Sequence, residues 1–468
     1  MELGFIIVVV IIFWGVLAWG FILYSHFYGK KNALTIPGAV ASNLFLGNLP
    51  DIITGGGLAK YLAKLHAKHG PVVSFWWEST QVISTYTADA FKKQSHWFNR
   101  PEFLFANLIP LIGEKSIQVT NGSKGKRLRS YLDNSFTHKA VEGYIPTLLD
   151  IGQEIVDSWD KYLDGEKVPA RESLMGAALK ATAQTSFGDY FSDNAACRHF
   201  NELYGKTWDE AESMLTEPKK RYSDEFSDCV EKMRAITNKI ALDRKINPPT
   251  DGGRMLIDEI IDVADSDEEI NDLCLTYIVA GYHNSGNLLT WMTYFLARYP
   301  DIQERVYDEL VTVLGKSEPF YDYKANDLKL LKHVIDETLR VSSLASFAAR
   351  YADEEVEIGG HKIPAGTPVV QALNCSYENE EVFPNAQSFD PDRFDRDHIG
   401  ILDFCPFGFA GKRQCPGQRF TYIEVYCFMS VIMRKFRFAL YDPEDKPKKV
   451  WGLLVHPDRE IWIRLSRR

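Results

Sequence analysis

The stretch Pro406-Phe-Gly-Phe-Ala-Gly-Lys-Arg-Gln-Cys-Pro-Gly417, which runs on into Gln418-Arg-Phe420, decides the fold. It reads as a glycine-rich loop that ends in a cysteine, followed by a proline near the first position of a helix. Glycines let the backbone approach a neighbouring group closely. The free amides and the positive end of the following helix favour a thiolate over a thiol at Cys415. The loop therefore predicts that Cys415 carries chemistry.

The rest of the chain is predicted to be mainly helical with a small β part. Residues 123–345 show helical spacing of apolar positions almost throughout. A last helix is predicted over Gly417–Lys435, directly after the cysteine. A lone thiolate at a helix N-terminus in a mostly α protein suits iron. The other predicted elements are a helix over Leu58–His69 and strands over Val72–Trp76, Gln81–Tyr86, Val356–Ile358, His361–Ile363 and Thr367–Gln371.

Composition and charge narrow the class of protein. The chain has 468 residues, 45% hydrophobic and 25% charged, which is typical of globular proteins. Its formal net charge of -10 argues against a nucleic-acid partner, because phosphate binding needs a basic face. The seven cysteines are odd in number, scattered and without a CxxC pair. They predict neither a disulfide framework nor a zinc site, and they suit a reducing compartment.

The amino terminus is predicted to anchor the chain in a membrane. No charged residue occurs from Leu3 to Tyr24, and a helix of that length spans the apolar core of a bilayer. The basic pair Lys30-Lys31 follows and places the rest of the chain in the cytosol. A cleaved signal peptide is the alternative, but the apolar run exceeds a usual signal core and no basic cluster precedes it. We expect an uncleaved transmembrane signal anchor over residues 1–24, a linker over 25–45 and a globular domain over 46–468.

One predicted helix is far longer than the usual globular helix. Ser266-Asp-Glu-Glu269 fits a capping box, and no proline follows before Pro300. A helix of about thirty residues should cross the whole domain. Its middle holds the small and polar stretch Ala280–Gly286, in which each glycine weakens the helix by about 1 kcal/mol relative to alanine. Close approach by a flat ligand explains this stretch, and so does a kinked core helix with small packing residues.

The cysteine loop, residues 406–417, resembles that of the cytochrome P-450 superfamily, Gly-x-Arg-x-Cys-x-Gly. The family also has a Phe three residues before the first glycine, where this chain has Gly408 between Phe407 and Phe409. The resemblance implies the P-450 fold and haem b (iron protoporphyrin IX), with Cys415 as the iron ligand and Phe409 as a shield for the sulfur. It also implies that Arg413 pairs with a haem propionate. The four positions that match the family pattern are Gly411, Arg413, Cys415 and Gly417.

Further motifs follow in the family's order. Glu337-Thr-Leu-Arg340 resembles the Glu-x-x-Arg pair, whose members lie one helical turn apart. The later segment Phe389–Phe394 resembles the one whose arginine, here Arg393, joins that pair in a structural triad. The resemblance implies that residues 46–468 form a haem-thiolate catalytic domain.

Two more arginines are implied to bind haem propionates. Arg350 falls where the family places one of them, and Arg129 where it places the other. Four residues before Arg129 the family has a tryptophan, and this chain has Gly125. We expect haem anchoring to be looser there.

The long helix departs from the family at the positions that deliver protons during dioxygen activation. Ala280 and Gly281 match the family's small residues and would lie against the haem. The acid and the two threonines that follow are replaced by His283, Asn284 and Ser285. Histidine relays protons near neutral pH, although it can equally satisfy a backbone group. Asparagine forms hydrogen bonds but does not relay a proton easily, so Ser285 or ordered water is expected to take that part.

Within the superfamily the chain resembles the vertebrate orphan family numbered twenty, notably in Gly47–Ile52 and Gly70–Trp76. That family also departs from the dioxygen motif and has no settled substrate. Residues between the first hairpin and Arg129 line the distal pocket in this fold, and their apolar character implies an apolar substrate, with plain core packing as the alternative for each. The predicted pocket residues are Phe98, Phe103, Phe105, Leu108 and, on a second wall, Ser346.

Three functions remain open. A monooxygenase would insert one oxygen atom from O2 into an apolar small molecule (a lipid, steroid or xenobiotic), with electrons from NADPH through a separate membrane flavoprotein reductase. Lys126, Arg127 and Lys412 would meet that reductase, unless they are ordinary surface charges. An isomerase or dehydratase would rearrange a peroxide without O2 or reductase, which the loss of threonine at Asn284 favours. A haem protein that only binds a lipid is the third. We expect a monomer in the endoplasmic reticulum membrane, with one transmembrane helix and a cytosolic catalytic domain.

Overall fold

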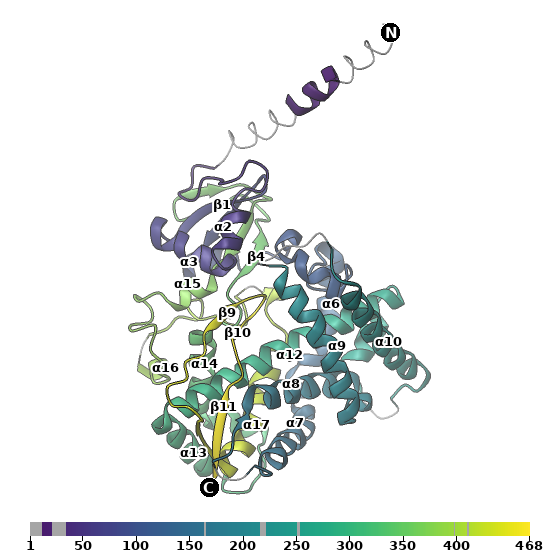
Figure 1. Ribbon diagram of the computed structural model, residues 1–468, viewed down its shortest axis with the longest axis vertical. Coiled ribbons are helices and arrows are strands. Elements are labelled where there is room, and N and C mark those ends of the chain that lie inside the picture. The colour runs from purple at the N-terminus through teal and green to yellow at the C-terminus, as the bar shows by residue number, and fades with distance from the viewer. Residues whose placement is uncertain are drawn as a thin grey trace.

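The computed structural model describes residues 12–20, 34–162, 165–215, 221–249, 253–396, 398–409 and 411–468. A large helical body carries a smaller β-rich end, and the C-terminus lies at the opposite end of the body (Figure 1). The helices are α2 (Leu49–Thr54), α3 (Leu58–His69), α4 (Ala88–Lys93), α5 (Ile109–Ile112), α6 (Gly122–Leu132), α7 (His138–Trp159), α8 (Ala170–Phe187), α9 (Asn194–Ser213), α10 (Asp224–Ile246), α11 (Leu256–Val263), α12 (Asp267–Arg298), α13 (Pro300–Leu314), α14 (Lys329–Ser342), α15 (Leu373–Tyr377), α16 (Arg393–Arg396) and α17 (Gln418–Lys435). The strands are β1 (Val72–Trp77), β2 (Thr80–Thr85), β3 (Val168–Pro169), β4 (Ala348–Tyr351), β5 (Val356–Ile358), β6 (His361–Ile363), β7 (Pro368–Gln371), β8 (Phe436–Leu440), β9 (Lys449–Trp451), β10 (Val455–Pro457) and β11 (Trp462–Arg467).

The mainly helical fold with a minor β part is confirmed, and most predicted elements occur within one residue of their predicted bounds. Helix α3 and strands β5 and β6 begin and end where the sequence places them. The predicted hairpin is the antiparallel pair β1 and β2, which aligns Val72 with Thr85. The predicted last helix is α17, which begins at Gln418 directly after the cysteine loop.

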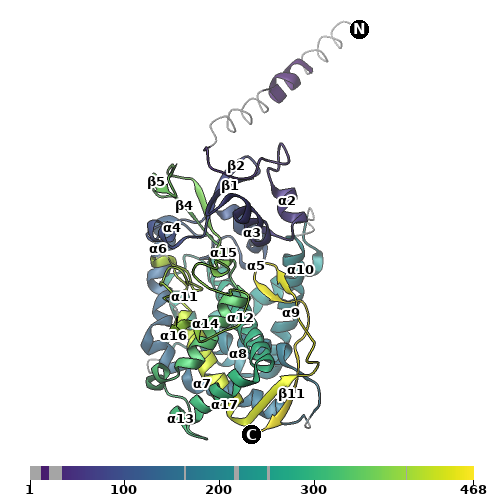
Figure 2. The ribbon, with the colours of Figure 1, turned by 90° about the vertical axis from the view of Figure 1, so that its left-hand side faces the viewer.

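The long helix α12 passes through the middle of the body (Figures 1 and 2). It runs without a break from Asp267 to Arg298, and most of its residues are buried. The hydroxyl of Ser266 accepts a hydrogen bond from the amide of Glu269 at 3.3 Å, which is half of the predicted capping box. The carboxylate of Glu269 turns instead to the amide of Asp265, at 2.7 Å. A helix that is buried on nearly every side forms the core around which the other helices pack.

The two glycines of the α12 midsection face helix α8. A Cβ atom at Gly281 would lie 2.5 Å from the Oγ1 atom of Thr182, and one at Gly286 would lie 3.2 Å from the Cα atom of Met175. Both glycines are therefore explained by close packing of α8 on α12. These contacts favour small packing residues, in a helix without a break, over a flat ligand as the reason for the glycines.

The β-rich end is built on a four-stranded sheet in the order β1-β2-β7-β4. The amide of Ser74 in β1 donates to the carbonyl of Pro37 at 2.8 Å, and the amide of Ala39 donates back to the carbonyl of Ser74 at 2.9 Å. The end of the segment expected to be a linker, residues 25–45, therefore lies along the sheet. A second sheet, β3-β11-β8, joins the C-terminus to the helical body.

The predicted membrane anchor lies mostly outside the described residues. Residues 12–20 form a helix whose apolar side chains are exposed. Within the described ranges, no helix combines the length and the apolar character needed to cross a bilayer.

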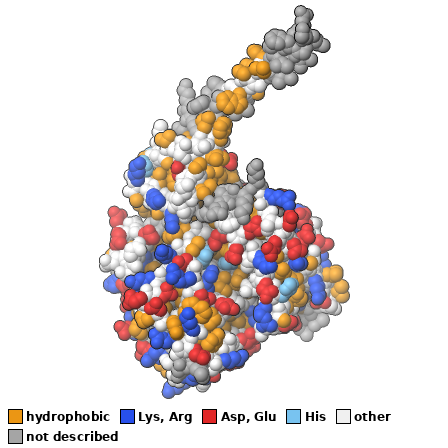
Figure 3. All heavy atoms as spheres, in the orientation of Figure 1, with side chains coloured by type: hydrophobic (Ala, Val, Ile, Leu, Met, Phe, Trp, Pro, Cys, Tyr) orange, Lys and Arg blue, Asp and Glu red, His pale blue; other side chains and the backbone are white. Residues whose placement is uncertain are grey.

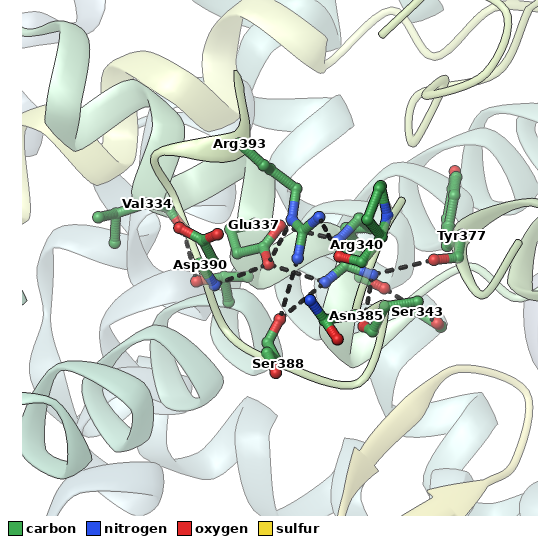
Figure 4. A network of polar contacts seen from close by, with 12 residues as sticks. Val334, Glu337, Arg340, Ser343, Tyr377, Asn385, Ser388, Asp390 and Arg393 are labelled. Atoms are coloured by element: carbon green, nitrogen blue, oxygen red, sulfur yellow. Dashed lines mark hydrogen bonds and ion pairs between the residues drawn. The ribbon is translucent and has the colours of Figure 1, made fainter. Parts of the chain in front are cut away.

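Three buried charged residues tie α14 to the segment that follows α15 (Figure 4). Glu337 accepts hydrogen bonds from Arg340 at 2.7 and 2.8 Å and from Arg393 at 3.0 Å. The Arg340 guanidinium also donates to the carbonyls of Tyr377, Ala386 and Ser388. All three charged side chains are at most 1% exposed. The triad implied by the family resemblance is thus formed, and it fixes the segment that leads into the cysteine loop.

Replacing Glu337 with alanine should destabilise the protein severely. The change leaves two buried guanidinium groups without their shared carboxylate, which costs about 3–5 kcal/mol for a buried pair of this kind. Thermal unfolding and the yield of soluble protein measure the effect. The matched control is Arg305→Ala, which breaks a half-exposed pair with Asp392 and should cost less than about 1 kcal/mol. Equal effects of the two variants would contradict a special role for the triad.

Candidate cofactor site around Cys415

Cys415 is a reachable thiol at the start of a buried helix. All seven cysteines are free, and Cys415 is the one whose side chain is exposed. Its amide donates to the carbonyl of Phe407 at 2.8 Å, which closes the loop. Removal from bulk water raises the pKa of the Cys415 thiol, while the amide of Gly417 and the guanidinium groups of Arg129 and Arg100 act to lower it. A ligand that excludes water and carries a positive charge would complete the stabilisation of the thiolate.

The glycines and aromatic residues of the loop fix its path. Gly408 has φ +88° and Gly411 has φ +26°, so both adopt the left-handed conformation that glycine tolerates best. A phenylalanine at position 408, as in the family pattern, would be strained here. Phe409 stacks on Phe91 of α4 with ring centroids 4.8 Å apart, and Phe407 packs against Tyr422. The proposed shielding of the sulfur by Phe409 stays a prediction.

Arg129 and Arg413 hold the loop from two sides. Arg129 of α6 forms a two-point ion pair with Asp133 at 2.7 and 3.0 Å and donates to the carbonyl of Gln414 at 2.8 Å. Arg413 donates to backbone carbonyls of the segment before α6, namely those of Phe98 (3.1 Å), Ile117 (2.7 Å) and Thr120. The loop before Cys415 is thus bound to α6 through the Gln414 carbonyl, and to the segment before α6 through the Arg413 side chain.

The site contains more buried positive charge than its carboxylates balance. Arg100, Arg129, Arg350 and Arg413, called the cation cluster below, lie close enough to repel one another. Burial is the larger cause and this repulsion the second cause of a lowered pKa at Arg100, Arg350 and Arg413. Among the described residues, no carboxylate forms an ion pair with these three arginines. The buried Nε atoms of Arg100 and Arg350 have no hydrogen-bond partner there either.

Arg100 is the site residue that sequence reasoning missed. Its own position gave no signal, because a single arginine in an irregular segment after a helix resembles any surface charge. Its nearest hydrogen-bond acceptor is the Gln118 side chain, and its carbonyl is bound to Asn121. An arginine within the apolar run between residues 97 and 112 was the signal that could have found it.

The structure explains the glycine at position 125. A Cβ atom there would collide with the carbonyl of Thr120 and would lie 2.9 Å from the Phe98 ring. That ring fills the space instead and lies under the Arg413 guanidinium, 4.0 Å from its centroid, with the Lys126 ammonium 5.6 Å away. Phe98 therefore supports the cation cluster. Its predicted place in a substrate pocket stays a prediction.

An opening on α12 lies one turn from the cluster. Tyr277 is close enough to Cys415, Arg129 and Arg413 for their charges to act on its hydroxyl group. One turn further on, Ala280 is exposed and Asn284 half-buried, although the helix around them is buried. The Asn284 side-chain amide donates to the carbonyl of Ala280 at 2.7 Å, which leaves its oxygen available as an acceptor. An exposed helix face at the centre of a protein needs a non-protein group or solvent to cover it.

His283 and Ser285 face other elements. The His283 ring stacks on Trp208 of α9 at 3.8 Å and packs against Tyr204 and Tyr282. Burial lowers the pKa of His283 well below its usual range, so the ring stays neutral at pH 7. Ser285 is buried toward the carboxyl group of Glu424 on α17. A proton relay through His283 stays a prediction. Because the His283 ring is neutral, it is only a weak proton donor.

The other predicted pocket residues lie between the β-rich end and the body. Phe105 stacks on Phe347 with centroids 6.4 Å apart, and Phe103 packs on Trp77 at 5.6 Å. Leu108 packs at the edge of the core formed by α9 to α12. Ser346 is buried, and its carbonyl accepts from the amide of Asn374. The structure brings Phe103, Phe105 and the segment of Ser346 together, and leaves Leu108 on another core.

The arrangement fits haem. A reachable thiolate offers an iron ligand, and guanidinium groups without carboxylate partners suit two propionates. The exposed part of α12 offers a face for a flat apolar group. Cys415 would hold the iron, and Arg100 and Arg350 have the donors to bind propionates. Most N–H donors of Arg129 and Arg413 already form hydrogen bonds with protein oxygens.

Gly125→Ala should destabilise the protein by about 1–3 kcal/mol, because the added methyl group meets the backbone of Thr120 and the Phe98 ring. Gly143→Ala is the control: nothing lies within 4 Å of its added Cβ in α7, and alanine should stabilise that helix by about 0.5–1 kcal/mol. Thermal unfolding of the two variants should therefore shift in opposite directions. A shift of the same sign would show that position 125 has room to spare.

Comparison with known proteins agrees with this geometry. The family model described as "Cytochrome P450" matches residues 37–464. The chain is 29% identical over 458 residues to "Cytochrome P450 20A1" of Rattus norvegicus and 27% identical over 459 residues to the protein of that name from Homo sapiens. In both cases 96% of each chain is covered. It is 28% identical over 349 residues to "Ent-kaurenoic acid oxidase 1" of Arabidopsis thaliana, covering 72% of this chain and 70% of the relative. Over residues 37–464 the chain therefore belongs to the cytochrome P450 family of haem-thiolate monooxygenases.

Proposed function

We propose that this chain is a membrane-anchored monooxygenase that inserts one oxygen atom from O2 into an apolar small molecule, with electrons from NADPH through a separate flavoprotein reductase. The observation that carries the proposal is the exposed thiol of Cys415 beside a cation cluster without enough carboxylates. Haem b, when bound, supplies the chemistry that activates dioxygen. The protein would contribute the thiolate ligand and the partners of the propionates.

The distal segment of α12 sets the supply of protons. The Asn284 amide is held to the Ala280 carbonyl and does not ionise, so it can orient a hydrogen-bonded water but cannot deliver a proton itself. His283 is neutral and enclosed by rings, which removes the usual acid. Water that reaches the exposed Ala280 is the remaining donor. This supports oxygen chemistry in which more of the electrons from NADPH end in hydrogen peroxide than in an enzyme that has the acid and threonine of the family pattern.

The aromatic contacts support an apolar substrate. Phe105 and Phe347 form a stacked pair from two segments far apart in the sequence, and the Arg100 guanidinium lies 5.8 Å from the Phe105 ring. A flat or extended apolar molecule would replace solvent at such rings. Lipids, steroids and xenobiotics all carry apolar surface of this kind, so any of them could be the substrate class.

The surface supports a membrane and a reductase as partners. Hydrophobic side chains gather on the β-rich end, whereas acidic and basic groups are mixed over the body (Figure 3). Val40, Phe45 and Leu46 are 88%, 53% and 46% exposed, and they precede the first sheet. This end, together with an anchor over residues 1–24, would bind the endoplasmic reticulum membrane and leave the body, as a monomer, in the cytosol.

The basic residues expected to meet the reductase differ in their pairing. Arg127 forms an ion pair with Asp265 at 2.9 Å, which neutralises it. Lys126 and Lys412 are exposed; Lys412 lies three residues before Cys415 in the chain, and the Lys126 ammonium lies 5.6 Å from the Phe98 ring that contacts Arg413. These two lysines, more than Arg127, are the candidates for contact with an acidic reductase surface.

The reduced protein should show a red-shifted Soret band in its carbon monoxide difference spectrum. Cys415→Ala should remove this band, because it removes the thiolate ligand. Cys405→Ala should retain it, since that buried cysteine lies ten residues earlier, packs in an apolar cluster and donates only a weak hydrogen bond, to the Leu402 carbonyl. If well-folded wild-type protein binds haem but lacks this band, a protein that only binds a lipid is the better explanation. If well-folded wild-type protein binds no haem, the proposed function is wrong.

Asn284→Thr should raise the share of NADPH electrons that leave as water or product and lower the share that leaves as hydrogen peroxide, by several-fold. Threonine supplies the hydroxyl that asparagine lacks. The assay measures NADPH and peroxide with the reductase and a saturated fatty acid, a steroid or an alkylated aromatic as probe. The matched control is Asn287→Thr, a buried amide one turn further along α12. Turnover of a lipid hydroperoxide without NADPH or reductase would show the isomerase to be correct.

A further inference from the structure

Two phenylalanines flank Gly408 and hold the cysteine loop, residues 406–417, to different helices. Phe409 stacks on Phe91 of α4 with ring centroids 4.8 Å apart, whereas Phe407 packs against Tyr422 of α17 with centroids 5.5 Å apart. Gly408 between them has φ +88° and no side chain of its own to pack. Because glycine leaves the backbone free to adopt other conformations, the two ring contacts help to fix this part of the loop.

Phe407 is also the residue to which the backbone of Cys415 is bound. The amide of Cys415 donates a hydrogen bond to the carbonyl of Phe407 at 2.8 Å, across the loop. The Phe407 ring is partly buried against the main core, while the Cys415 side chain is exposed. A displacement of Phe407 would therefore reach the residue that carries the thiol through a single hydrogen bond.

The side chain that packs on Phe407 is itself anchored to α14. The Tyr422 hydroxyl donates to one carboxylate oxygen of Asp336, and the other oxygen accepts from the Lys332 ammonium at 2.6 Å. Asp336 is only 2% exposed, so its hydrogen bonds form away from bulk water. Burial, and next the negative charge of Asp336, raise the pKa of Tyr422 well above its ordinary value, so the hydroxyl keeps its proton. A hydrogen bond to a buried carboxylate is charge-assisted and stronger than one between two neutral groups.

Helix α14 thus supports the surroundings of the cysteine loop through two adjacent acidic residues. Glu337 binds Arg393 and holds the segment that leads into the loop (Figure 4). Asp336 binds Tyr422, whose ring packs on Phe407 within the loop. The first contact belongs to the structural triad, whereas the second has no part in the site described so far.

We propose that Tyr422 and Asp336 are positioning residues for Cys415, because their hydrogen bond holds Phe407 and thereby fixes the backbone of the iron ligand. The inference rests on the proposed haem site. Neither residue touches the cofactor or the reacting atoms. Both act through the Phe407 ring and the bond between its carbonyl and the amide of Cys415.

The property that this arrangement controls is the reduction potential of the iron. A reduced haem-thiolate carries one more negative charge than the oxidised form, so water or an N–H group that reaches the sulfur stabilises the reduced form. Hydrogen bonds to the ligand and exposure to solvent are the means by which proteins tune such potentials. A loop held by Phe407 limits both and keeps the potential low, and a loosened loop raises it.

The test is a spectroelectrochemical titration of the full-length haem protein. Tyr422→Phe removes only the hydroxyl group. At a fixed applied potential it should raise the ratio of reduced to oxidised haem about threefold over wild type, which corresponds to about 30 mV for a one-electron couple. Asp336→Ala should raise the ratio equally, and the double variant should add nothing further, because both changes break one interaction. Asp336→Asn should restore the wild-type ratio, since its side-chain oxygen still accepts from Tyr422.

Two control variants separate this role from packing and from charge. Tyr144→Phe also removes a hydroxyl, which donates to the carbonyl of Ser135 at 3.2 Å, from a ring that packs on Phe420 of the same helix α17. It should lower the melting temperature about as much as Tyr422→Phe and keep the wild-type ratio. Lys332→Ala removes the ammonium that pairs with Asp336. It should also keep the wild-type ratio, because a side chain that is 51% exposed is screened by water.

A wild-type ratio in both Tyr422→Phe and Asp336→Ala would overturn the inference while the haem site stands. So would a rise in either control equal to that of Tyr422→Phe, because packing or charge would then explain the effect. If Asp336→Ala does not fold, Tyr422→Phe alone decides, since it deletes one oxygen atom. Absence of haem from well-folded wild-type protein would instead refute the proposed function, and the inference with it.

Discussion

Unbalanced positive charge is the constraint on which this structure depends. Arg100, Arg350 and Arg413 lie inside the protein within reach of one another's fields, and Asp133 balances only Arg129. Like charges a few ångströms apart repel by several kcal/mol even at an effective dielectric of about 20. Protein oxygens reduce this repulsion in part, because the Arg413 guanidinium is surrounded by carbonyls. The carboxylates of a bound group, such as the propionates of the proposed haem, would offset the rest of this repulsion.

The two buried groups of arginines differ in how they reach balance. In the triad, Glu337 shares one carboxylate between Arg340 and Arg393, and carbonyls of the following segment satisfy the remaining donors. That group is self-sufficient and serves to hold chain segments together. In the cation cluster, by contrast, only Arg129 has a carboxylate partner among the described residues, and the cluster lies beside the exposed Cys415. A preorganised binding site needs rigid support and donors that are still available to the ligand. The triad is suited to the first part and the cation cluster to the second.

Helix α12 and the residues around Cys415 show what a sequence can predict and where it stops. The bounds of α12 followed from Ser266 and Pro300, because capping and the absence of a backbone N–H act locally. The reason for Gly281 and Gly286 did not, because it lies in α8, about a hundred residues earlier. The partners of Arg413 were expected to be a propionate and proved to include three carbonyls of residues 98–120. Tertiary contacts decide which of several plausible partners a side chain takes, and spacing along the chain does not encode them.

The pairing of the C-terminal strand has a consequence for how the protein is made. The amide of Ala170 donates to the carbonyl of Ile461, β11 pairs with both β3 and β8, and Arg468 binds Glu304. The first helices of the body leave the ribosome long before Cys415 and these last residues do. The sheet β3-β11-β8 and the site around Cys415 can therefore form only when nearly the whole chain has been translated. Capture of haem would then be a late event in biosynthesis, and cells short of haem would accumulate a chain that is fully translated yet exposed to quality control.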